Sequence, residues 1–326
     1  MKIALVISSL EVGGAESQFC LIAGQLKDDG HEVEVWPLRK RGDFVAPIED
    51  AGIPVRDLGK RSKMDLLRPS INLWRYTKAL LPDAIFCSLP SACLHALVAK
   101  FTYPNAVFCW QIVATQSTLP NYGFLAGLGY VLQRRLAGSC DHYISNSRAG
   151  AVSAVQDGFS RDKMHVLQNG IDTSRFYPDP DSGEHWLMQN KLNRNRPTIG
   201  IVGRLDPAKD HDTFFKAVNI LEALSPGIAQ YIVVGWGSGA HADAVINRIE
   251  ELRKQGIAVV HVPHQGDMPP MYNACNIFTM SSISEGLPNA LLEALACGSF
   301  CVVTNVGDCA EVVAKYGVVV EIRDHV

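Results

Sequence analysis

Short apolar, β-branched runs recur along the chain, with helix-length segments between many of them. The first half contains KIALVISS, HEVEVWPL, DAIFCSL, AVFCWQIV, DHYISNS and MHVLQNG, and the second half contains PTIGIVG, QYIVVGWG, IAVVHVP, NIFTMSS and SFCVVTNV. Strands that alternate with helices are typical of parallel sheets covered by helices. Two such series predict an α/β protein with two Rossmann-like domains.

The segment between the two series, FYPDPDSGEHWLMQNKLNRNRP, is rich in Pro, Asp and Asn and shows little periodicity. It predicts a linker over residues 176–197. The linker would separate an N-terminal domain, residues 1–175, from a C-terminal domain, residues 198–326. A length of 326 residues with 47% hydrophobic residues is enough for two cores.

The stretch SSISEGLPNALLEALACG, residues 281–298, predicts a loop followed by a short helix. Pro288 suits the first turn of a helix, residues 290–296 are strong helix formers, and Gly298 is a natural stop. Glu285 then precedes the helix, and Glu293 points out from its second turn.

The backbone amides of Gly286, Leu287 and the residues after Pro288 would form an anion site between these two acids. A ligand with phosphate in its middle and hydroxyl groups at both ends would fit this arrangement. The plain alternative is that both glutamates are solvated charges at the helix ends.

Two other loops follow the first strand of each domain, where parallel α/β sheets form their sites. In the first domain Gly13 and Gly14 precede a helix predicted near Ser17, and paired glycines allow close backbone approach to a phosphate or sugar, or make a tight turn. In the second domain Arg204 and Lys209 lie at the mouth of a helix predicted near Asp210. A guanidinium fork and an ammonium group are what a diphosphate needs.

Composition excludes several classes of protein. The nine cysteines have spacings that match no common zinc or disulfide framework, so we expect reduced, buried thiols in a cytoplasmic protein. The N-terminus has no signal-peptide pattern, and no apolar run approaches the length that spans a membrane. A sequence pI of about 6.4 and the lack of a reader motif argue against nucleic acid as a partner.

Basic residues cluster in the first domain. Residues 1–170 contain 18 Lys and Arg against 15 Asp and Glu, or +3, and the remaining residues contain 12 against 18, or −6. The clusters Arg39–Arg41 and Lys60–Lys63, followed by Arg68, Arg75 and Lys78, predict either peripheral contact with anionic lipid headgroups or a lipid-linked phosphate, or simply a solvated face.

Together the motifs GGAE, NGIDTSRFYP, VGRLDPAKD and SEGLPNALLEALACG, in this order, resemble the retaining glycosyltransferases of family 4 over essentially the whole chain. The resemblance implies the GT-B arrangement, with two facing Rossmann-like domains and a nucleotide sugar bound by the second. It implies that Glu285 contacts the donor sugar, Glu293 the ribose, and the Gly286 and Leu287 amides the diphosphate.

The resemblance also implies that Arg204 and Lys209 neutralise the leaving diphosphate, so that no metal or other cofactor is needed. The segment HVPHQGDMPPMYNACNIF resembles the base-binding loop of this family, which implies that Val262 and His264 lie near the base. His261 and His264 are equally well explained as polar residues at a strand end.

The chain departs from the family pattern in two places. Many members have a histidine on the strand that reads AVFCWQIVATQ here, where Trp110 and Gln111 occupy its expected place. Gln111 can hydrogen-bond a sugar but cannot act as a general base, and His95 in the preceding helical stretch is a poor substitute. Members also usually continue beyond GVVVEI, so we expect a C-terminal domain that is short.

The leading hypothesis is a cytoplasmic, hexosyltransferase-like enzyme. It would move a sugar from a nucleotide diphosphate, probably UDP, to an acceptor in polysaccharide, lipopolysaccharide or glycolipid assembly. A nucleotide-sugar epimerase on the same fold and a non-catalytic nucleotide-sugar binder remain alternatives, because fold alone does not decide function.

Overall fold

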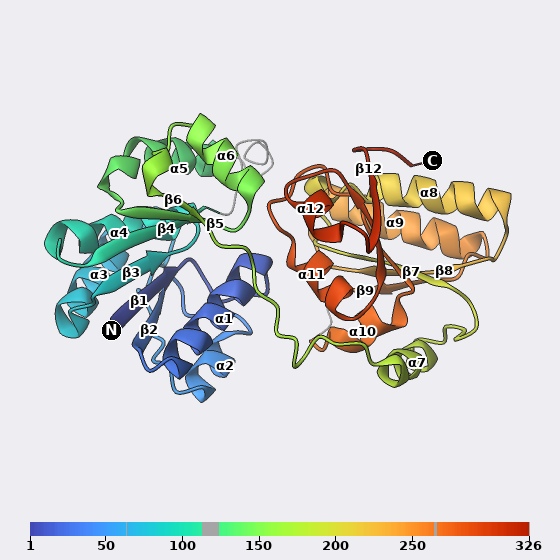
Figure 1. Cartoon of the computed structure of the whole chain (residues 1–326), viewed down its shortest axis with the longest axis horizontal. Helices are drawn as coiled ribbons and strands as arrows, with labels where there is room; N and C mark the ends of the chain where they lie inside the picture. Colours follow the sequence, from blue (N-terminus) through green and yellow to red (C-terminus); the bar gives the residue numbers. More distant parts are fainter. Residues whose placement is uncertain (63, 113–123, 264–265, 326) are drawn as a thin grey trace. The chain divides into compact units, whose positions relative to one another are not determined.

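The computed structural model describes residues 1–62, 64–112, 124–263 and 266–325. Among the described residues the chain forms two compact units, Met1–Gly170 and Ile171–Val326, each a parallel sheet flanked by helices (Figure 1). The strands of the first unit are β1 (Lys2–Ile7), β2 (Glu32–Pro37), β3 (Ala84–Cys87), β4 (Val107–Ile112), β5 (His142–Ser145) and β6 (Met164–Val166). Its helices are α1 (Gly14–Asp28), α2 (Val45–Asp50), α3 (Leu67–Leu80), α4 (Pro90–Thr102), α5 (Phe124–Arg135) and α6 (Arg148–Gln156).

The first sheet has the order β2-β1-β3-β4-β5-β6, and every pairing in it is parallel. Successive strands run outward from β1 to β2, and then β3 returns to the other side of β1. Ligands of open α/β sheets bind where the strand order reverses, outside the carboxyl ends of the strands. In this unit that point lies between β1 and β3.

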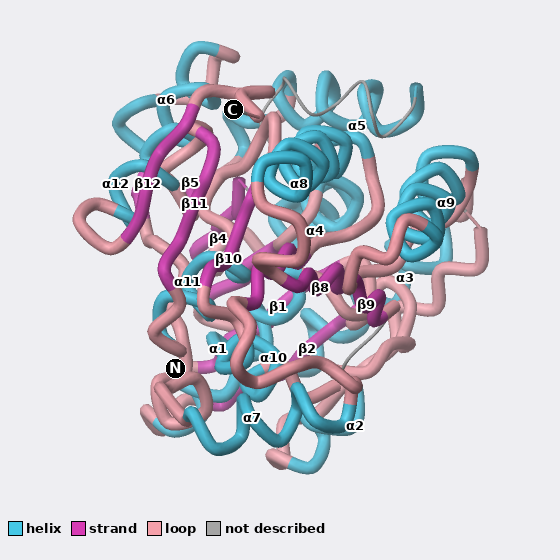
Figure 2. The backbone as a smooth tube through the Cα atoms, turned by 90° about the vertical axis from the view of Figure 1, so that its right-hand side faces the viewer, coloured by secondary structure: helices cyan, strands magenta, loops and turns pink. Residues whose placement is uncertain are grey.

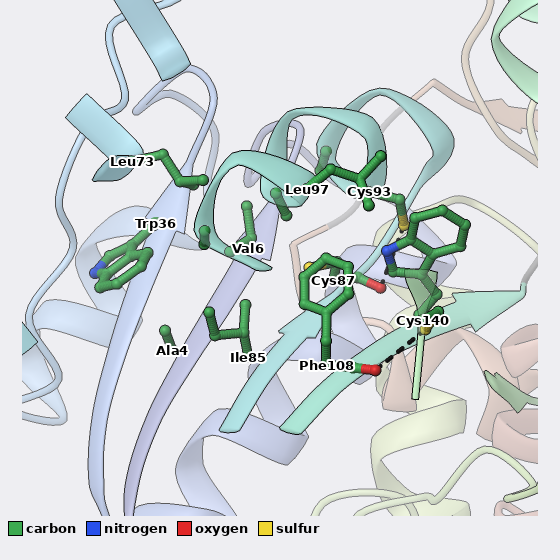
Figure 3. Packing of buried hydrophobic residues seen from close by; sticks show 14 of the residues in the cluster. Ala4, Val6, Trp36, Leu73, Ile85, Cys87, Cys93, Leu97, Phe108 and Cys140 are labelled. Carbon is green, nitrogen blue, oxygen red and sulfur yellow. Dashed lines mark hydrogen bonds between the residues drawn. The ribbon is translucent and has the colours of Figure 1, made fainter. Parts of the chain in front are cut away.

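Strand β1 shows why both faces of this sheet are apolar. Ala4 and Val6 join a core cluster with residues of α3 and α4, whereas Ile3, Leu5 and Ile7 join a cluster with residues of α1 and α2. Successive side chains of a strand point to opposite faces, so a strand covered on both sides reads as a continuous apolar run. Figure 3 shows the first cluster, with Trp36, Leu73, Phe108 and Cys140 around β1, β3 and β4.

The second unit has the strands β7 (Thr198–Val202), β8 (Gln230–Val234), β9 (Val259–Val262), β10 (Ile277–Met280), β11 (Phe300–Thr304) and β12 (Gly317–Val320). Its helices are α7 (Pro180–Gln189), α8 (His211–Leu224), α9 (Ala240–Lys254), α10 (Pro269–Ala274), α11 (Asn289–Ala296) and α12 (Cys309–Val313). The sheet order is β12-β11-β10-β7-β8-β9, again parallel throughout. Its strand order therefore reverses between β7 and β10.

Helices cover both faces of the second sheet as well. Helices α8 and α9 pack on one face, through Phe214, Phe215 and Ile249, and appear as neighbouring cyan coils in Figure 2. The other face carries α7, α10, α11 and α12, with Trp186, Tyr272 and other residues in its cluster. All eleven apolar runs that the sequence singles out contain a strand, which confirms the predicted α/β architecture of two Rossmann-like units.

The segment 176–197, for which we predicted a linker, lies in the second unit and contains helix α7. Asp179 caps this helix by accepting a hydrogen bond from the Ser182 amide at 3.1 Å. Gly183 lies so close to α10 that a β-carbon there would be 2.5 Å from the Asn273 carbonyl oxygen. The Asn273 side chain in turn accepts a hydrogen bond from the Asp179 amide at 2.8 Å. The polar composition of the segment reflects caps and turns that fix it to α10.

One helix begins earlier than the sequence predicts, and the helix expected near Asp210 begins as predicted. Helix α1 starts at Gly14 rather than near Ser17, with Gly13 as its extended N-cap residue. Asp210 is the N-cap of α8, which starts at His211, and a short 3-10 turn, Pro207–Lys209, precedes it. Within the described part of the chain, no helix has both the length and the apolar character needed to cross a bilayer.

Candidate active site

The loops that follow β7 and β10 meet at the point where the second sheet reverses its strand order. The Ile283 amide donates to the Ala208 carbonyl at 2.9 Å, and the Ser281 hydroxyl lies 2.9 Å from the carbonyl oxygens of both Lys209 and Asp210. These bonds join the VGRLDPAKD and SEGLP segments, which are more than 70 residues apart in the chain. Two of the predicted motifs therefore share one site within the second unit.

Lys209 and Glu285 form an ion pair across this junction. The carboxylate oxygen that contacts the Lys209 ammonium group also accepts a hydrogen bond from the buried Ser282 hydroxyl at 2.7 Å. The Lys209 and Glu285 side chains are 21% and 12% exposed. The pair is thus largely shielded from solvent but still accessible to a ligand.

Gly203, the first residue after β7, allows the Lys209 side chain to reach Glu285. A β-carbon on Gly203 would lie 3.2 to 3.4 Å from three side-chain carbons of Lys209. These distances are tighter than ordinary van der Waals contact, so a larger residue would push the lysine away. The glycine therefore has a positional role in the site.

The loop after β11 supports the other side of the SEGLP segment. The Asp308 amide donates to the Gly286 carbonyl at 3.0 Å, and a β-carbon on Gly307 would lie 2.6 Å from the Glu285 carbonyl oxygen. Gly307 also has a φ of 56°, in the left-handed region that favours glycine. Among the described residues the Gly286 amide has no hydrogen-bond acceptor. A donor just before a helix suits an anionic ligand.

Arg204 lies at the end of β7 and is half-exposed. Its guanidinium forms an ion pair with Asp206 at 2.9 Å, and the other oxygen of Asp206 accepts a hydrogen bond from the Ala208 amide at 3.0 Å. The aspartate therefore holds the arginine against the same loop that carries Lys209. Both predicted cations belong to one loop, with Arg204 beside Asp206 and Lys209 beside Glu285.

Glu293 lies on α11 and is largely covered, so the alternative interpretation of a solvated charge at the helix end is wrong for this residue, and its contact with a ribose stays a prediction. Its carboxylate accepts a hydrogen bond at 2.6 Å from Tyr272, which is fully buried on α10. Burial raises the pKa of Glu293, while the Tyr272 hydroxyl and the charge of Arg175 act in the opposite direction. Helix α11 packs against α10, and the pattern within the α11 segment does not reveal this contact with another helix.

The predicted base-binding residues fall partly outside the described part of the chain. His264 lies outside the described residues. Val262 ends β9, and its carbonyl accepts a hydrogen bond from the Gly235 amide at 3.0 Å. The neighbouring His261 ring donates to the Gly235 carbonyl, also at 3.0 Å. The carboxyl ends of β8 and β9 are therefore joined beside the site.

His211, which sequence analysis missed, is buried at the start of α8. Among the described atoms neither of its ring nitrogens has a hydrogen-bond partner, and the ring of His241 on α9 lies 6.5 Å away. Burial lowers the pKa of His211 to about 4, assisted by the charges of His241, Lys209 and His261. Its place in the motif, one residue after the predicted helix start, was the only available signal.

In the first unit Gly13 and Gly14 end the loop after β1 and begin α1. A side chain on Gly13 would overlap the carboxylate of Glu16, which folds back over the start of the helix. One turn further, the buried side chain of Gln18 donates to the Gly170 carbonyl at 2.8 Å and accepts from the Gly170 amide at 3.0 Å. The GGAE motif is thus joined to the NGIDTSRFYP motif.

Trp110 and Gln111 lie near the end of β4, in different surroundings. The Trp110 ring packs in the core against Phe108 and Tyr143, at centroid distances of 6.0 and 6.4 Å. Gln111 is buried, and its carbonyl oxygen has no partner among the described residues. His95 is also buried and lies 2.7 Å from the Lys60 ammonium nitrogen, and burial lowers its pKa to about 4. Its neutral ring accepts from Lys60.

No group of three or more His, Cys, Asp or Glu side chains in the described residues is arranged to hold a metal ion. The nine cysteines are free, and seven of them are buried. Burial raises the pKa of the two others, Cys20 to about 12 and Cys109 to about 11. The prediction of buried thiols therefore holds for seven of the nine cysteines, and their reduced state stays a prediction.

Comparison with known proteins identifies the family. Residues 12–175 match the model named Glycosyltransferase Family 4, and residues 196–326 match the model named Glycosyl transferases group 1. The chain is 26% identical over 209 residues to the D-inositol 3-phosphate glycosyltransferase of Salinispora arenicola, covering 60% of this chain and 44% of that protein. It is 29% identical over 145 residues to UDP-Gal:alpha-D-GlcNAc-diphosphoundecaprenol alpha-1,3-galactosyltransferase of Escherichia coli, covering 44% of this chain and 37% of that protein.

These matches span less than half the length of the curated relatives. The crystal structure of HepE of Anabaena in complex with UDP and glucose superposes with a TM-score of 0.84 at 22% identity, covering 100% of this chain and 87% of that chain. The structure of WaaG, a glycosyltransferase involved in lipopolysaccharide biosynthesis, gives 0.76 at 17%, covering 98% and 86%. Both confirm the GT-B fold, and with the two family models they show that the chain belongs to the family 4 glycosyltransferases.

Proposed function

We propose that this protein is a retaining glycosyltransferase that moves a sugar from a UDP-sugar donor to a saccharide or lipid-linked acceptor. The observation that carries the proposal is the Lys209–Glu285 pair at the strand-order reversal of the second sheet. It puts a cation and a carboxylate side by side, directly before the Gly286 amide. A nucleotide sugar needs both, because its diphosphate is anionic and its sugar carries hydroxyl groups.

The chemistry follows from the charges that develop during transfer. Breaking the bond between the anomeric carbon and the diphosphate oxygen leaves positive character on the sugar and negative charge on the nucleotide. Lys209 and Arg204 would stabilise the leaving diphosphate, and Glu285 would lie near the electron-poor sugar. Because two cations supply this stabilisation, we infer that the reaction needs no metal ion.

The donor proposal is supported by names among the relatives and structural neighbours. HepE was crystallised with UDP-glucose, and the relative in Escherichia coli is named for transfer from UDP-Gal. The acceptor proposal is supported more broadly, since WaaG is involved in lipopolysaccharide biosynthesis and the relative in Escherichia coli acts on a diphosphoundecaprenol sugar. The proposed role is therefore in polysaccharide, lipopolysaccharide or glycolipid assembly.

The test begins with calorimetric titration of the full chain with UDP-, ADP- and GDP-sugars. We expect a UDP-sugar to bind and free UDP to compete with it. The sugar that binds is then supplied with saccharide acceptors, with and without EDTA, and the anomeric configuration of the product is read by proton NMR. Lack of binding to every nucleotide sugar would overturn the proposal.

Three further results would change the proposed function. An inverted product would exclude retention, and loss of turnover in EDTA would exclude the metal-free mechanism. An epimerised donor without transfer would assign the site to an epimerase. Binding without turnover under any condition would assign it to a nucleotide-sugar binder.

A further inference from the structure

Helix α3 has apolar side chains on two separate faces. One face is buried against the sheet and α4, through Pro69, Leu73, Thr77 and Leu80. The other face presents Leu67, Ile71 and Trp74, which are 78%, 55% and 45% exposed. Because each residue of an α-helix turns by about 100°, positions 67, 71 and 74 fall on one stripe, roughly 130° around the helix from Leu73. A helix that needs only one apolar face for its core therefore has a second one.

The exposed apolar surface extends into the segment before the helix. Met64 and Leu66 are 76% and 59% exposed, so five large apolar side chains lie within eleven residues of chain. Single exposed apolar residues are common on protein surfaces, but a contiguous group marks an interaction site. This group, residues 64–74, is the most concentrated apolar exposure in the first unit among the described residues.

Exposed cations border the same stripe. Arg61, Arg68, Arg75 and Lys78 are exposed, and among the described residues none of them has an acidic side chain within ion-pair distance. Residues 56–80 contain seven Lys and Arg against two Asp, a local charge of +5, in a chain of net charge −3. The stripe is thus both apolar and cationic.

The other predicted basic groups do not belong to this surface. Lys40 pairs with Glu49 at 2.6 Å, and Arg41 pairs with Glu11 at 3.3 Å. Lys60 turns inward to the buried His95. Of the predicted basic clusters, Arg61, Arg68, Arg75 and Lys78 therefore remain around α3, and Lys63 lies outside the described residues.

We propose that helix α3, together with Arg61, Met64 and Leu66 before it, is a docking surface for an anionic lipid bilayer. Leu67, Ile71 and Trp74 would enter the boundary between headgroups and acyl chains, where Trp is preferred. The bordering cations would meet the lipid phosphates. Charge decides this occupant over a second copy of the chain, because two copies of this cationic surface would repel each other. The proposal does not rest on the transferase activity.

The experiment measures sedimentation of the full chain with vesicles of phosphatidylcholine alone or mixed with phosphatidylglycerol. We expect binding to the mixed vesicles, with an affinity that falls as salt rises. The triple variant Arg68→Gln, Arg75→Gln, Lys78→Gln should bind roughly a hundredfold more weakly, given the contribution of each cation near a membrane. The control Arg194→Gln, Lys216→Gln, Lys254→Gln has the same net charge and should bind like the parent protein.

The apolar stripe has its own pair of variants. Ile71→Ser, Trp74→Ser should also weaken binding at least tenfold, whereas Val152→Ser, Leu224→Ser, which changes two apolar side chains that are 58% and 76% exposed elsewhere, should not. Circular dichroism and thermal melting check that each variant folds. Equal binding by the α3 variants and their controls overturns the proposal. So does a dimer in sedimentation velocity that the Ile71→Ser, Trp74→Ser variant dissociates, which would assign the surface to a second copy.

Discussion

The Lys209 ammonium group and the Glu285 carboxylate, 76 positions apart in the chain, form an ion pair at the carboxyl end of the second sheet. A bound diphosphate would compete with Glu285 for Lys209, because both partners are anionic. Donor binding is then an exchange of partners, in which Glu285 becomes free to contact the sugar. The proposed function therefore predicts different consequences for the two sides of the pair.

Removing the cation should weaken binding of the nucleotide itself. For Lys209→Ala or Arg204→Ala we expect a loss of about 1.5–3 kcal/mol in binding of UDP or in transition-state stabilisation, the range for hydrogen bonds that involve a charged group. Calorimetry with UDP and steady-state kinetics with the donor measure both effects. The matched control is Lys216→Ala on α8, whose ammonium group pairs with Asp212 on the helix surface. Unchanged UDP affinity and turnover in both site variants would refute the assignment of these cations.

Substitutions of Glu285 and Glu293 should have different effects on the kinetic constants. Glu285→Gln should mainly lower kcat, because positive charge on the sugar develops only in the transition state. Its affinity for UDP, which has no sugar, should hardly change. Glu293→Gln should raise the apparent KM of the donor and weaken UDP binding together, because the ribose is the same in substrate and product.

The variant Tyr272→Phe tests whether the position of Glu293 matters for nucleotide binding. It removes the hydroxyl that donates to Glu293 and leaves the Lys209–Glu285 pair intact. We expect it to move KM and UDP affinity in the same direction as Glu293→Gln, with kcat little changed. If Glu285→Gln loses UDP affinity as severely as Glu293→Gln, or retains full kcat, the roles of the two carboxylates are wrongly assigned.

Gly307 should be intolerant of a side chain because it supports the Glu285 loop. Gly307→Ala is expected to lower the free energy of unfolding by roughly 2 kcal/mol or more and to weaken UDP binding, since a β-carbon would overlap the Gly286 carbonyl. The control Gly256→Ala has a φ of 83° but open space around its β-carbon. It should cost about 1 kcal/mol and leave UDP binding unchanged. Equal effects of the two variants on UDP affinity would separate Gly307 from the site.

Because His211 is buried with a lowered pKa, we expect the free energy of unfolding to fall at low pH. Its pKa is lowered to about 4 in the folded protein, from about 6.5 when unfolded, so the unfolded chain binds more protons between these values. The stabilising contribution is complete above pH 6.5 and disappears as the pH falls toward 4, at most about 3 kcal/mol. Urea unfolding of the protein and of His211→Phe at pH 7 and pH 5 measures it. The variant should lose less stability on acidification, and an equal loss would contradict the prediction.

Much of the fold and part of the site were predictable because their signals are local. Continuous apolar runs mark strands covered on both faces, and the glycines, Pro288 and acids of SEGLP define a loop before a helix. The order of motifs along the chain then implies that loops at the carboxyl ends of strands meet. The contact between the loops of Lys209 and Glu285 follows from this topology, because β7 and β10 are neighbours in the sheet.

The parts that sequence could not predict depend on packing between distant segments. The sequence places Glu293 on the second turn of its helix but does not show that Tyr272 of α10 covers it. The residues 176–197 have the composition of a linker, yet the close packing of Gly183 and the hydrogen bond of the Asp179 amide attach them to α10. Likewise His95 and Lys60 are 35 positions apart, and the sequence around neither residue predicts their contact.

The two hydrogen bonds between the Gln18 side chain and the backbone of Gly170 resemble a base pair, with one group donating and accepting at the same time. Two antiparallel hydrogen bonds fix both the distance and the orientation of the peptide that they hold. The chain therefore leaves the first unit from a fixed point, and the next residue, Ile171, already packs against the core of the second unit. Because the Gly170 amide is held by this pair of bonds, its hydrogen exchange is expected to be slow.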